Sequence, residues 1–269
     1  MPEVRIVVPK DMDKALDALV KLGFAGNKAE LARAALTHFL STLPTQIPKG
    51  YDLETAFSPD GRVFQIEFAK ETTRRGGTIV GIRCAEGVVL AKELLEEDPF
   101  VITPNPFIEI FKVHEDIGIV YCGLQTDGCA VVEEAVKQVD FLKKKGSVDI
   151  ETLSRKLLLF MQTFGQRKDV RPLGTSLIIG GIDAENKPRV FLLEVGASAQ
   201  EYEACAKGTG EDEGRDILKE EYKPDLSLED AKKLALKVAL RETRKPENVL
   251  LATIDSKTRT FKEVTLEEK

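Results

Sequence analysis

Runs of apolar residues divide the chain into a small first part and a large second part. A β-branched run at 4–8 predicts a short strand, and two stretches with helical apolar spacing follow it, over 12–22 and 27–39. The segment 44–50 then contains two prolines and a glycine and shows no apolar period, which is typical of a linker. The pattern therefore predicts three parts, namely a domain at 1–43, a linker at 44–50 and a second domain at 51–269.

Polar residues ahead of the helical stretches supply candidate helix caps. Asp11 precedes the first helical run, and Asn27 with Glu30 forms a capping-box pattern at the start of the second. In the large part, Asp149 and Ser227 stand in the same position before two further runs. These residues predict where four helices begin.

The large part contains apolar runs arranged in pairs around short polar turns, and each pair predicts an antiparallel hairpin. The pairs are 77–83 with 87–92, 108–114 with 117–124, and 174–183 with 188–194. Two more strands are predicted at 249–254 and 261–264. Helical spacing lies between them, over 129–142, 149–164 and 227–238. This order predicts an α+β fold with antiparallel sheets in layers.

The segment 62–69 fits two periods equally well. The alternation of Phe64, Ile66 and Phe68 is that of a strand, whereas Phe64 and Phe68 are also spaced as neighbours on one helix face. Counting residues leaves both assignments open.

The small part offers one strand and two helices in about 40 residues, which is too little to bury a core alone. We therefore expect this unit to dimerise. Its order of strand, helix and helix resembles a ribbon-helix-helix domain, in which strands from two chains pair into a ribbon and the helices interlock.

That resemblance raises DNA binding as an alternative, because the family usually reads bases with the outward side chains of the ribbon. If alternate residues of the strand face the core, the outward positions are Glu3, Arg5 and Val7. One acid, one base and one valine make a poor surface for a polyanion. The candidate DNA contacts are Arg5, Asn27 and Lys28, but dimerisation is the interpretation we favour over DNA binding or the docking of another protein.

Charge and composition narrow the function further. The net charge is −6 and the pI about 5.3, which argues against a protein that binds nucleic acid over its whole surface. Four scattered cysteines and two histidines fit neither a zinc site nor a disulfide framework, so we expect no metal and no cofactor. No apolar run reaches the roughly 20 residues of a membrane span, and 1–9 has no signal-peptide layout. A cytoplasmic protein without a membrane partner is the expectation.

The stretch 51–69 carries the longest motif in the chain. It reads Tyr-Asp-Leu-Glu-Thr-Ala-Phe-Ser-Pro-Asp-Gly-Arg-Val-Phe-Gln-Ile-Glu-Phe-Ala and resembles the N-terminal signature of proteasome α-type subunits. Further matches to that family follow in order at 77–82, 122–127, 170–176, 180–183 and 221–231. The resemblance implies the four-layer αββα sandwich of the N-terminal-nucleophile hydrolases, and it implies a helix over 61–75.

A catalytic role has to be weighed, because β-type subunits of that family cut peptides with a threonine freed at a Gly–Thr bond. Thr78 follows Gly77 here, and the family's acid falls on Glu93. The family's lysine, however, falls near Asn105, between two prolines, where no ammonium is available. A self-processing threonine endopeptidase with Thr78 and Glu93 is therefore the alternative, and we expect no catalytic residue.

In α-type subunits the leader instead builds the ring and its gate. Carried over by resemblance, the gate and ring contacts are Tyr51, Asp52, Pro59 and Phe68. Phe68 departs from the tyrosine of the family and lacks its hydroxyl donor.

The resemblance also implies a pocket for the C-terminal carboxylate of activator ATPases, at Glu109 and Gly123. Glu109 stands where the family has a lysine, and two facing carboxylates repel. The sequence therefore predicts poor binding of such activators.

These observations favour a non-catalytic, proteasome α-like subunit that forms a ring or scaffold, with the first domain directing its assembly. Its expected partners are further copies of itself, through both domains, and β-type subunits. Rings of the family usually hold an odd number of subunits, in which the first domains cannot all pair within one ring. An even ring, or two rings joined through these domains, is then expected. A DNA-binding regulator that uses the sandwich as an oligomerisation scaffold is the remaining alternative.

Overall fold

The computed structural model describes residues 8–42, 56–94, 100, 109–167, 170–196, 198–240 and 248–264. The chain forms two compact units, Met1–Asp52 and Leu53–Lys269. None of the helices in the described ranges combines the length and apolar character that a membrane span needs.

The first unit is a pair of helices, α1 (Lys10–Lys21) and α2 (Lys28–Thr42). The prediction that Asp11 caps the first helix is wrong, because Pro9 occupies the cap position and Asp11 lies inside the helix. Proline is suited to a helix start, where its missing N–H has no partner to lose.

The second helix begins as predicted. The Asn27 side-chain oxygen accepts a hydrogen bond from the Glu30 N–H at 2.8 Å, and the Glu30 carboxylate reaches back to the Gly26 N–H at 2.9 Å. Within its described residues this unit is helical only, since Val8 is not in a strand. The rest of the predicted strand at 4–8, and the predicted linker at 44–50, lie outside the described residues.

The second unit contains two antiparallel sheets of five strands each within the described ranges. The first sheet has the order β10-β9-β2-β1-β8 and the second β3-β4-β5-β6-β7. The strands of the first sheet are β1 (Ile79–Cys84), β2 (Gly87–Glu93), β8 (Ala204–Lys207), β9 (Val249–Asp255) and β10 (Thr260–Val264). Those of the second are β3 (Phe111–His114), β4 (Ile117–Gly123), β5 (Thr175–Ile182), β6 (Pro188–Glu194) and β7 (Ser198–Glu201).

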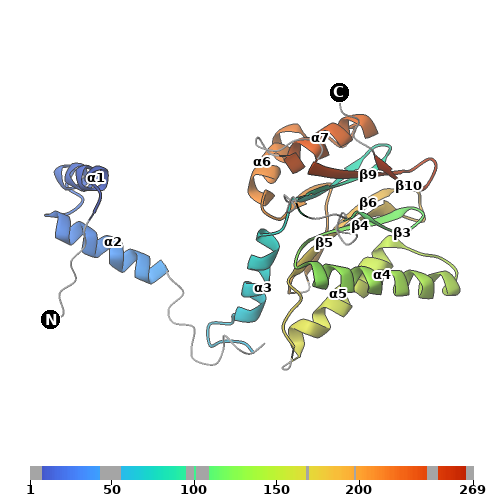
Figure 1. Ribbon diagram of the computed structural model, residues 1–269, viewed down its shortest axis with the longest axis horizontal. Coiled ribbons are helices and arrows are strands. Elements are labelled where there is room, and N and C mark those ends of the chain that lie inside the picture. Colours follow the sequence, from blue (N-terminus) through green and yellow to red (C-terminus); the bar gives the residue numbers. More distant parts are fainter. Residues whose placement is uncertain are drawn as a thin grey trace. The chain divides into compact units, whose positions relative to one another are not determined.

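Helices cover both outer faces of the stacked sheets. Helices α6 (Glu211–Glu221) and α7 (Leu228–Leu240) lie on the first sheet, and α4 (Gln125–Lys145) and α5 (Ile150–Gln166) on the second (Figure 1). Three buried apolar clusters fill the spaces between the layers, one under each helix pair and one between the sheets. The fold is the expected four-layer αββα sandwich, and hydrophobic burial at three interfaces stabilises it.

The three predicted hairpins are all present, and the two further predicted strands form β9 and β10, which pair with each other. Two of the predicted caps begin helices of this unit. Asp149 accepts a hydrogen bond from the Thr152 N–H at 2.8 Å, and Ser227 accepts one from the Asp230 N–H at 3.1 Å. Helices α5 and α7 begin directly after these residues.

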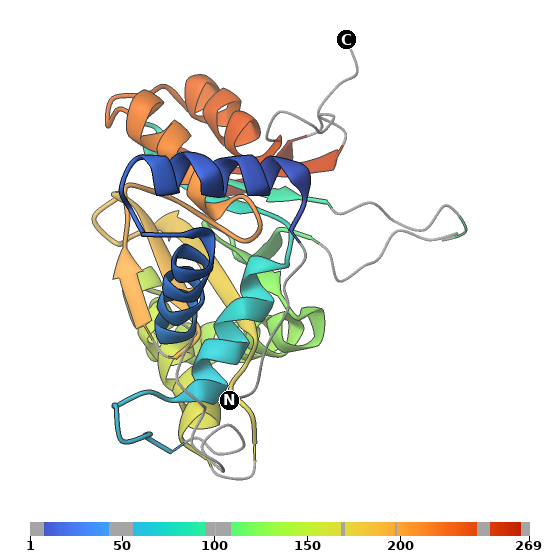
Figure 2. The ribbon, with the colours of Figure 1, turned by 90° about the vertical axis from the view of Figure 1, so that its left-hand side faces the viewer.

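The ambiguous segment forms a helix, α3 (Phe64–Arg74), which crosses one end of the sandwich (Figure 2). Phe64, Ala69 and Thr73 are buried, whereas the side chain of Phe68 is 45% exposed. A strand would bury Phe64, Ile66 and Phe68 together, whereas the buried Ala69 and Thr73 are four residues apart, as on one helix face.

Candidate functional site

The motif ahead of α3 folds into a tight turn. The Gly61 N–H donates to the Ser58 carbonyl at 2.8 Å, and Gly61 has a positive φ of 78°. The Ser58 hydroxyl donates to Asp60 at 2.5 Å and accepts from the Arg62 N–H at 3.0 Å. Its bond to Asp60 lowers the pKa of that carboxyl. Serine, proline, aspartate and glycine each suit their position in such a turn, so the local sequence determines where the helix starts.

Arg62 then fixes the first turn of α3. Its guanidinium Nε donates to the Glu67 carboxylate at 2.8 Å, a second N–H contacts the other oxygen, and the group lies 4.7 Å from the centre of the Phe64 ring. The hydrogen bond from Arg62 lowers the pKa of Glu67. The pair is partly exposed, so it orients the helix start more than it stabilises the fold.

Two contacts attach α3 to the end of the sandwich. The Thr72 hydroxyl donates to the Gly174 carbonyl, just before β5, at 2.9 Å. The Gly76 carbonyl accepts from the Thr209 N–H at 2.9 Å and from its hydroxyl at 2.6 Å. A Cβ on Gly174 would lie 2.5 Å from the Thr72 oxygen, so glycine is needed for this close approach.

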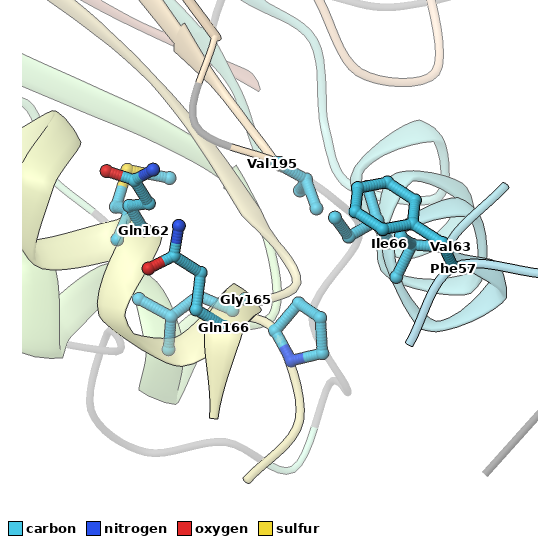
Figure 3. Close-up of a pocket in the computed structure, with 11 residues that line it drawn as sticks. Phe57, Val63, Ile66, Gln162, Gly165, Gln166 and Val195 are labelled. Carbon is cyan, nitrogen blue, oxygen red and sulfur yellow. The ribbon is translucent and has the colours of Figure 1, made fainter. Parts of the chain in front are cut away.

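A cavity of about 420 Å³ lies between the start of α3 and the end of α5. Figure 3 shows Phe57, Val63 and Ile66 on one side and Gln162 and Gln166 of α5 on the other. The remaining lining residues are Met161, Gly165, Pro172, Leu173, Val195 and Gly196. The walls are mostly apolar, with two amides able to form hydrogen bonds.

The described part of the chain contains two of the four residues predicted as gate and ring contacts. Pro59 is exposed in the turn, and Phe68 is exposed on α3. Tyr51 and Asp52 lie outside the described residues. Phe57, which the sequence analysis did not single out, is 76% exposed at the edge of the cavity. Two large exposed apolar side chains on one short segment are typical of a contact surface.

Thr78 and Glu93 are in contact and fully enclosed. Thr78 is 0% and Glu93 1% exposed, and the Thr78 hydroxyl donates to the Glu93 carboxylate at 2.7 Å. The Thr78 N–H donates to the same carboxylate oxygen at 2.8 Å, and the Gly210 N–H donates to the Thr78 hydroxyl at 3.0 Å. The arrangement satisfies the hydrogen-bonding groups of a buried polar pair. Asn105 lies outside the described residues.

The two predicted positions of the activator pocket differ in environment. Glu109 is exposed, whereas Gly123 lies at the end of β4 with a positive φ of 102°. Gly123 lines a second cavity, of about 130 Å³, together with the buried Lys92. Glu109 does not line that cavity. The sequence analysis missed Lys92, because a lysine at the end of a strand usually reaches solvent.

Asp127 and Arg171 form a contact that spacing alone did not indicate. The guanidinium of Arg171 donates to both carboxylate oxygens of Asp127, at 2.5 and 2.9 Å, and the Gly174 N–H donates to the same group at 2.7 Å. Asp127 lies in the first turn of α4, where a negative charge is favoured. The contact joins α4 to the segment before β5, and the hydrogen bonds that Arg171 donates to Asp127 raise the pKa of Arg171.

Asn27 and Lys28, two of the residues predicted to contact DNA, form hydrogen bonds or ion pairs within the protein. The Asn27 oxygen caps α2, and the Lys28 ammonium lies between Asp13 and Asp17 at 2.7 and 2.8 Å. Hydrogen bonds to these carboxylates raise the pKa of Lys28. A phosphate would have to replace two carboxylates at Lys28. Arg5 lies outside the described residues.

The family model and the relatives that match this chain carry the same family description. A family model described as "Proteasome subunit" matches residues 73–254. The chain is 36% identical over 226 residues to "Proteasome subunit alpha" of Methanobrevibacter smithii, covering 81% of this chain and 89% of that relative. It is 35% identical over 231 residues to the protein of the same description from Archaeoglobus fulgidus, covering 81% and 90%. It is 34% identical over 226 residues to "Proteasome subunit alpha" of Methanocaldococcus jannaschii, covering 82% of this chain and 86% of that relative.

Proposed function

The chain belongs to the proteasome subunit family, with relatives of the α type, and on that premise we propose that it is a non-catalytic subunit that builds a ring or scaffold. The observation that carries this proposal is the enclosure of Thr78. Its hydroxyl and its N–H both donate to the buried Glu93 carboxylate, so the bond before Thr78 lies in an enclosed, hydrogen-bonded site. A threonine peptidase needs a free amine beside the hydroxyl as its base.

Helix α3 and its leader turn support a role in ring contacts. The leader would have to be discarded in a self-processing peptidase, and helix α3, which continues from it, is bound to the sandwich through Thr72 and through Gly76 just after the helix. The exposed Phe57 and Phe68 are available to a neighbouring subunit. Further copies of the chain, and β-type subunits, are the partners that we propose for this surface.

The first unit has the properties of a pairing domain. Met12, Leu22, Phe24 and Leu36 are 44–72% exposed, and two helices are too few to bury them. A second copy of the unit would cover these side chains and pair the ribbon strands proposed at 4–8. We therefore assign assembly, rather than DNA recognition, to residues 1–43.

The bond between Gly77 and Thr78 is expected to stay intact in the purified chain. The physical reason is that Thr78 is fully buried and both of its donors are bound to Glu93. Intact mass spectrometry should give the mass of the whole chain, and turnover of fluorogenic peptides should be absent.

Thr175→Ala is the matched control for Thr78→Ala, because Thr175 is equally buried and its hydroxyl donates to the Cys122 carbonyl at 2.9 Å. Neither variant should alter peptide turnover. Loss of residues 1–77, or a peptidase activity that disappears only in Thr78→Ala, contradicts the proposed function.

Activator binding is expected to be weak because of Glu109. Peptides that end in hydrophobic-Tyr-X should show no measurable binding to the assembled wild-type protein, since their terminal carboxylate would face the Glu109 carboxylate. Glu109→Lys should improve binding by at least about tenfold. Glu115→Lys makes the same charge change at another exposed acid in the β3–β4 turn and should have no such effect. Fluorescence anisotropy measures the affinities, and low micromolar binding by the wild type would disprove the electrostatic argument.

A further inference from the structure

Lys92 is a buried lysine at the wall of a small cavity. The residue is 6% exposed and lies near the end of β2, at the edge of the core between the sheets. The cavity of about 130 Å³ is lined by Gly76, Gly77, Lys92, Glu93, Tyr121, Cys122, Gly123 and Gln125. A Cβ on Gly76 would lie 2.4 Å from the Gly123 nitrogen, so glycine backbones form the close wall of this space.

The amine of Lys92 has an unusual set of neighbours. It lies 4.1 Å from the centre of the Tyr121 ring, over its face. Among the described residues, no carboxylate or carbonyl oxygen accepts a hydrogen bond from it. A cation–π contact replaces only part of the hydration that a buried ammonium loses. The charged form of Lys92 is therefore disfavoured.

Of the titratable groups around this amine, the Cys122 thiol and the Tyr121 hydroxyl stay protonated near neutral pH, and the Glu93 carboxylate is bound to Thr78. Burial raises the pKa of Cys122 to about 12, and burial also raises the pKa of Tyr121. The Glu93 carboxylate, on the same strand, is hydrogen-bonded to Thr78, and the Cys129 thiol of α4 contacts the Tyr121 hydroxyl at 3.5 Å. Burial accordingly lowers the pKa of Lys92 to about 8.

We propose that Lys92 is a covalent modification site that takes small aldehydes into the cavity as imines. The neutral amine attacks the carbonyl carbon through its nitrogen lone pair and forms a carbinolamine. The carbonyl oxygen then leaves as water with two protons, and a C=N bond replaces the C=O bond. The step needs no oxidant or reductant. The imine has no primary amine, so no ammonium has to be buried against the apolar wall. The cavity has room for the short carbon chain of the aldehyde.

Lys207 shows why Lys92 is distinct. It is also largely enclosed, with its side chain 13% exposed, but its ammonium is bound to Glu194 at 2.6 Å and to Glu211 at 2.9 Å. Burial opposes its charge, yet the two hydrogen bonds raise the pKa of Lys207. Its amine is therefore protonated under conditions in which a large fraction of Lys92 is neutral.

The test is competitive labelling of the full chain with propanal and sodium cyanoborohydride, which reduces each imine to a stable propylamine. After a short reaction near neutral pH, peptide mapping by mass spectrometry should show Lys92 modified at least about tenfold faster than Lys207, because a desolvated lysine has more neutral amine. The labelling rate at Lys92 should rise with pH and level off above about pH 8. 2-Naphthaldehyde, which is too large for the cavity, should label exposed lysines such as Lys187 but not Lys92.

Two controls separate cavity chemistry from general reactivity. In urea the preference for Lys92 over Lys207 should disappear, because both amines are then hydrated. In Lys92→Met the labelling of all other lysines should be unchanged. Equal rates at Lys92 and Lys207 in the folded protein, or equal access of both aldehydes to Lys92, would overturn the proposal.

Discussion

Replacing Asp127 with alanine is expected to lower the free energy of unfolding of the sandwich by about 2–4 kcal/mol. The carboxylate, 8% exposed, accepts hydrogen bonds from Arg171 and from the Gly174 N–H. Its removal leaves that buried N–H without its acceptor and removes a negative charge from the first turn of α4. Urea unfolding of the full chain, followed by circular dichroism, measures the change.

Two further variants divide this loss between its contacts. Asp127→Asn keeps an acceptor for the Gly174 N–H but loses the charge, so about 1–2 kcal/mol is expected. Arg171→Ala should cost only about 1 kcal/mol, because the arginine side chain is 55% exposed. If Asp127→Ala is no more destabilising than Arg171→Ala, the contact does not hold α4 to the segment before β5.

Deleting residues 1–48 is expected to change the native mass of the assembly while the sandwich stays folded. The second unit, Leu53–Lys269, has its own buried clusters on both sides of its sheets, so it does not need the first unit for its core. If the first units join two rings, the deletion should give about half the native mass. Native mass spectrometry measures the assembly, and circular dichroism reports the fold.

Phe24→Ser is the corresponding point variant. Phe24 is 71% exposed between α1 and α2, so its replacement should weaken pairing of the first units without unfolding α1 or α2. Arg5→Ala tests the regulator alternative. An unchanged native mass after the deletion, together with sequence-specific DNA binding that Arg5→Ala abolishes, would favour a DNA-binding regulator over an assembly domain.

The local sequence was sufficient for most of the sandwich. Each predicted hairpin had two apolar runs around a polar turn, and all three formed. Strands β7 and β8 and helix α6 were missed for a physical reason. Ala204–Lys207 is only four residues long, too short to show a period. Ser198–Glu201 is a largely polar edge strand, and Glu211–Glu221 has few apolar residues, so neither shows a clear period. They form because β7 can pair with β6 and β8 with β1, and α6 then packs on β8.

The sequence by itself determined the hairpins, the caps at Asn27, Asp149 and Ser227, and the likeness to proteasome α-type subunits. Each of these depends on residues close together in the chain. The apolar period left 62–69 open and the resemblance implied a helix over 61–75, but only the tertiary structure fixed its bounds at Phe64–Arg74, where the buried Ala69 and Thr73 follow the helical spacing. It also placed Asp127 against Arg171 and left Lys92 without an oxygen acceptor among the described residues. Such contacts join residues far apart in the sequence, and they depend on how sheets and helices pack, which no local pattern records.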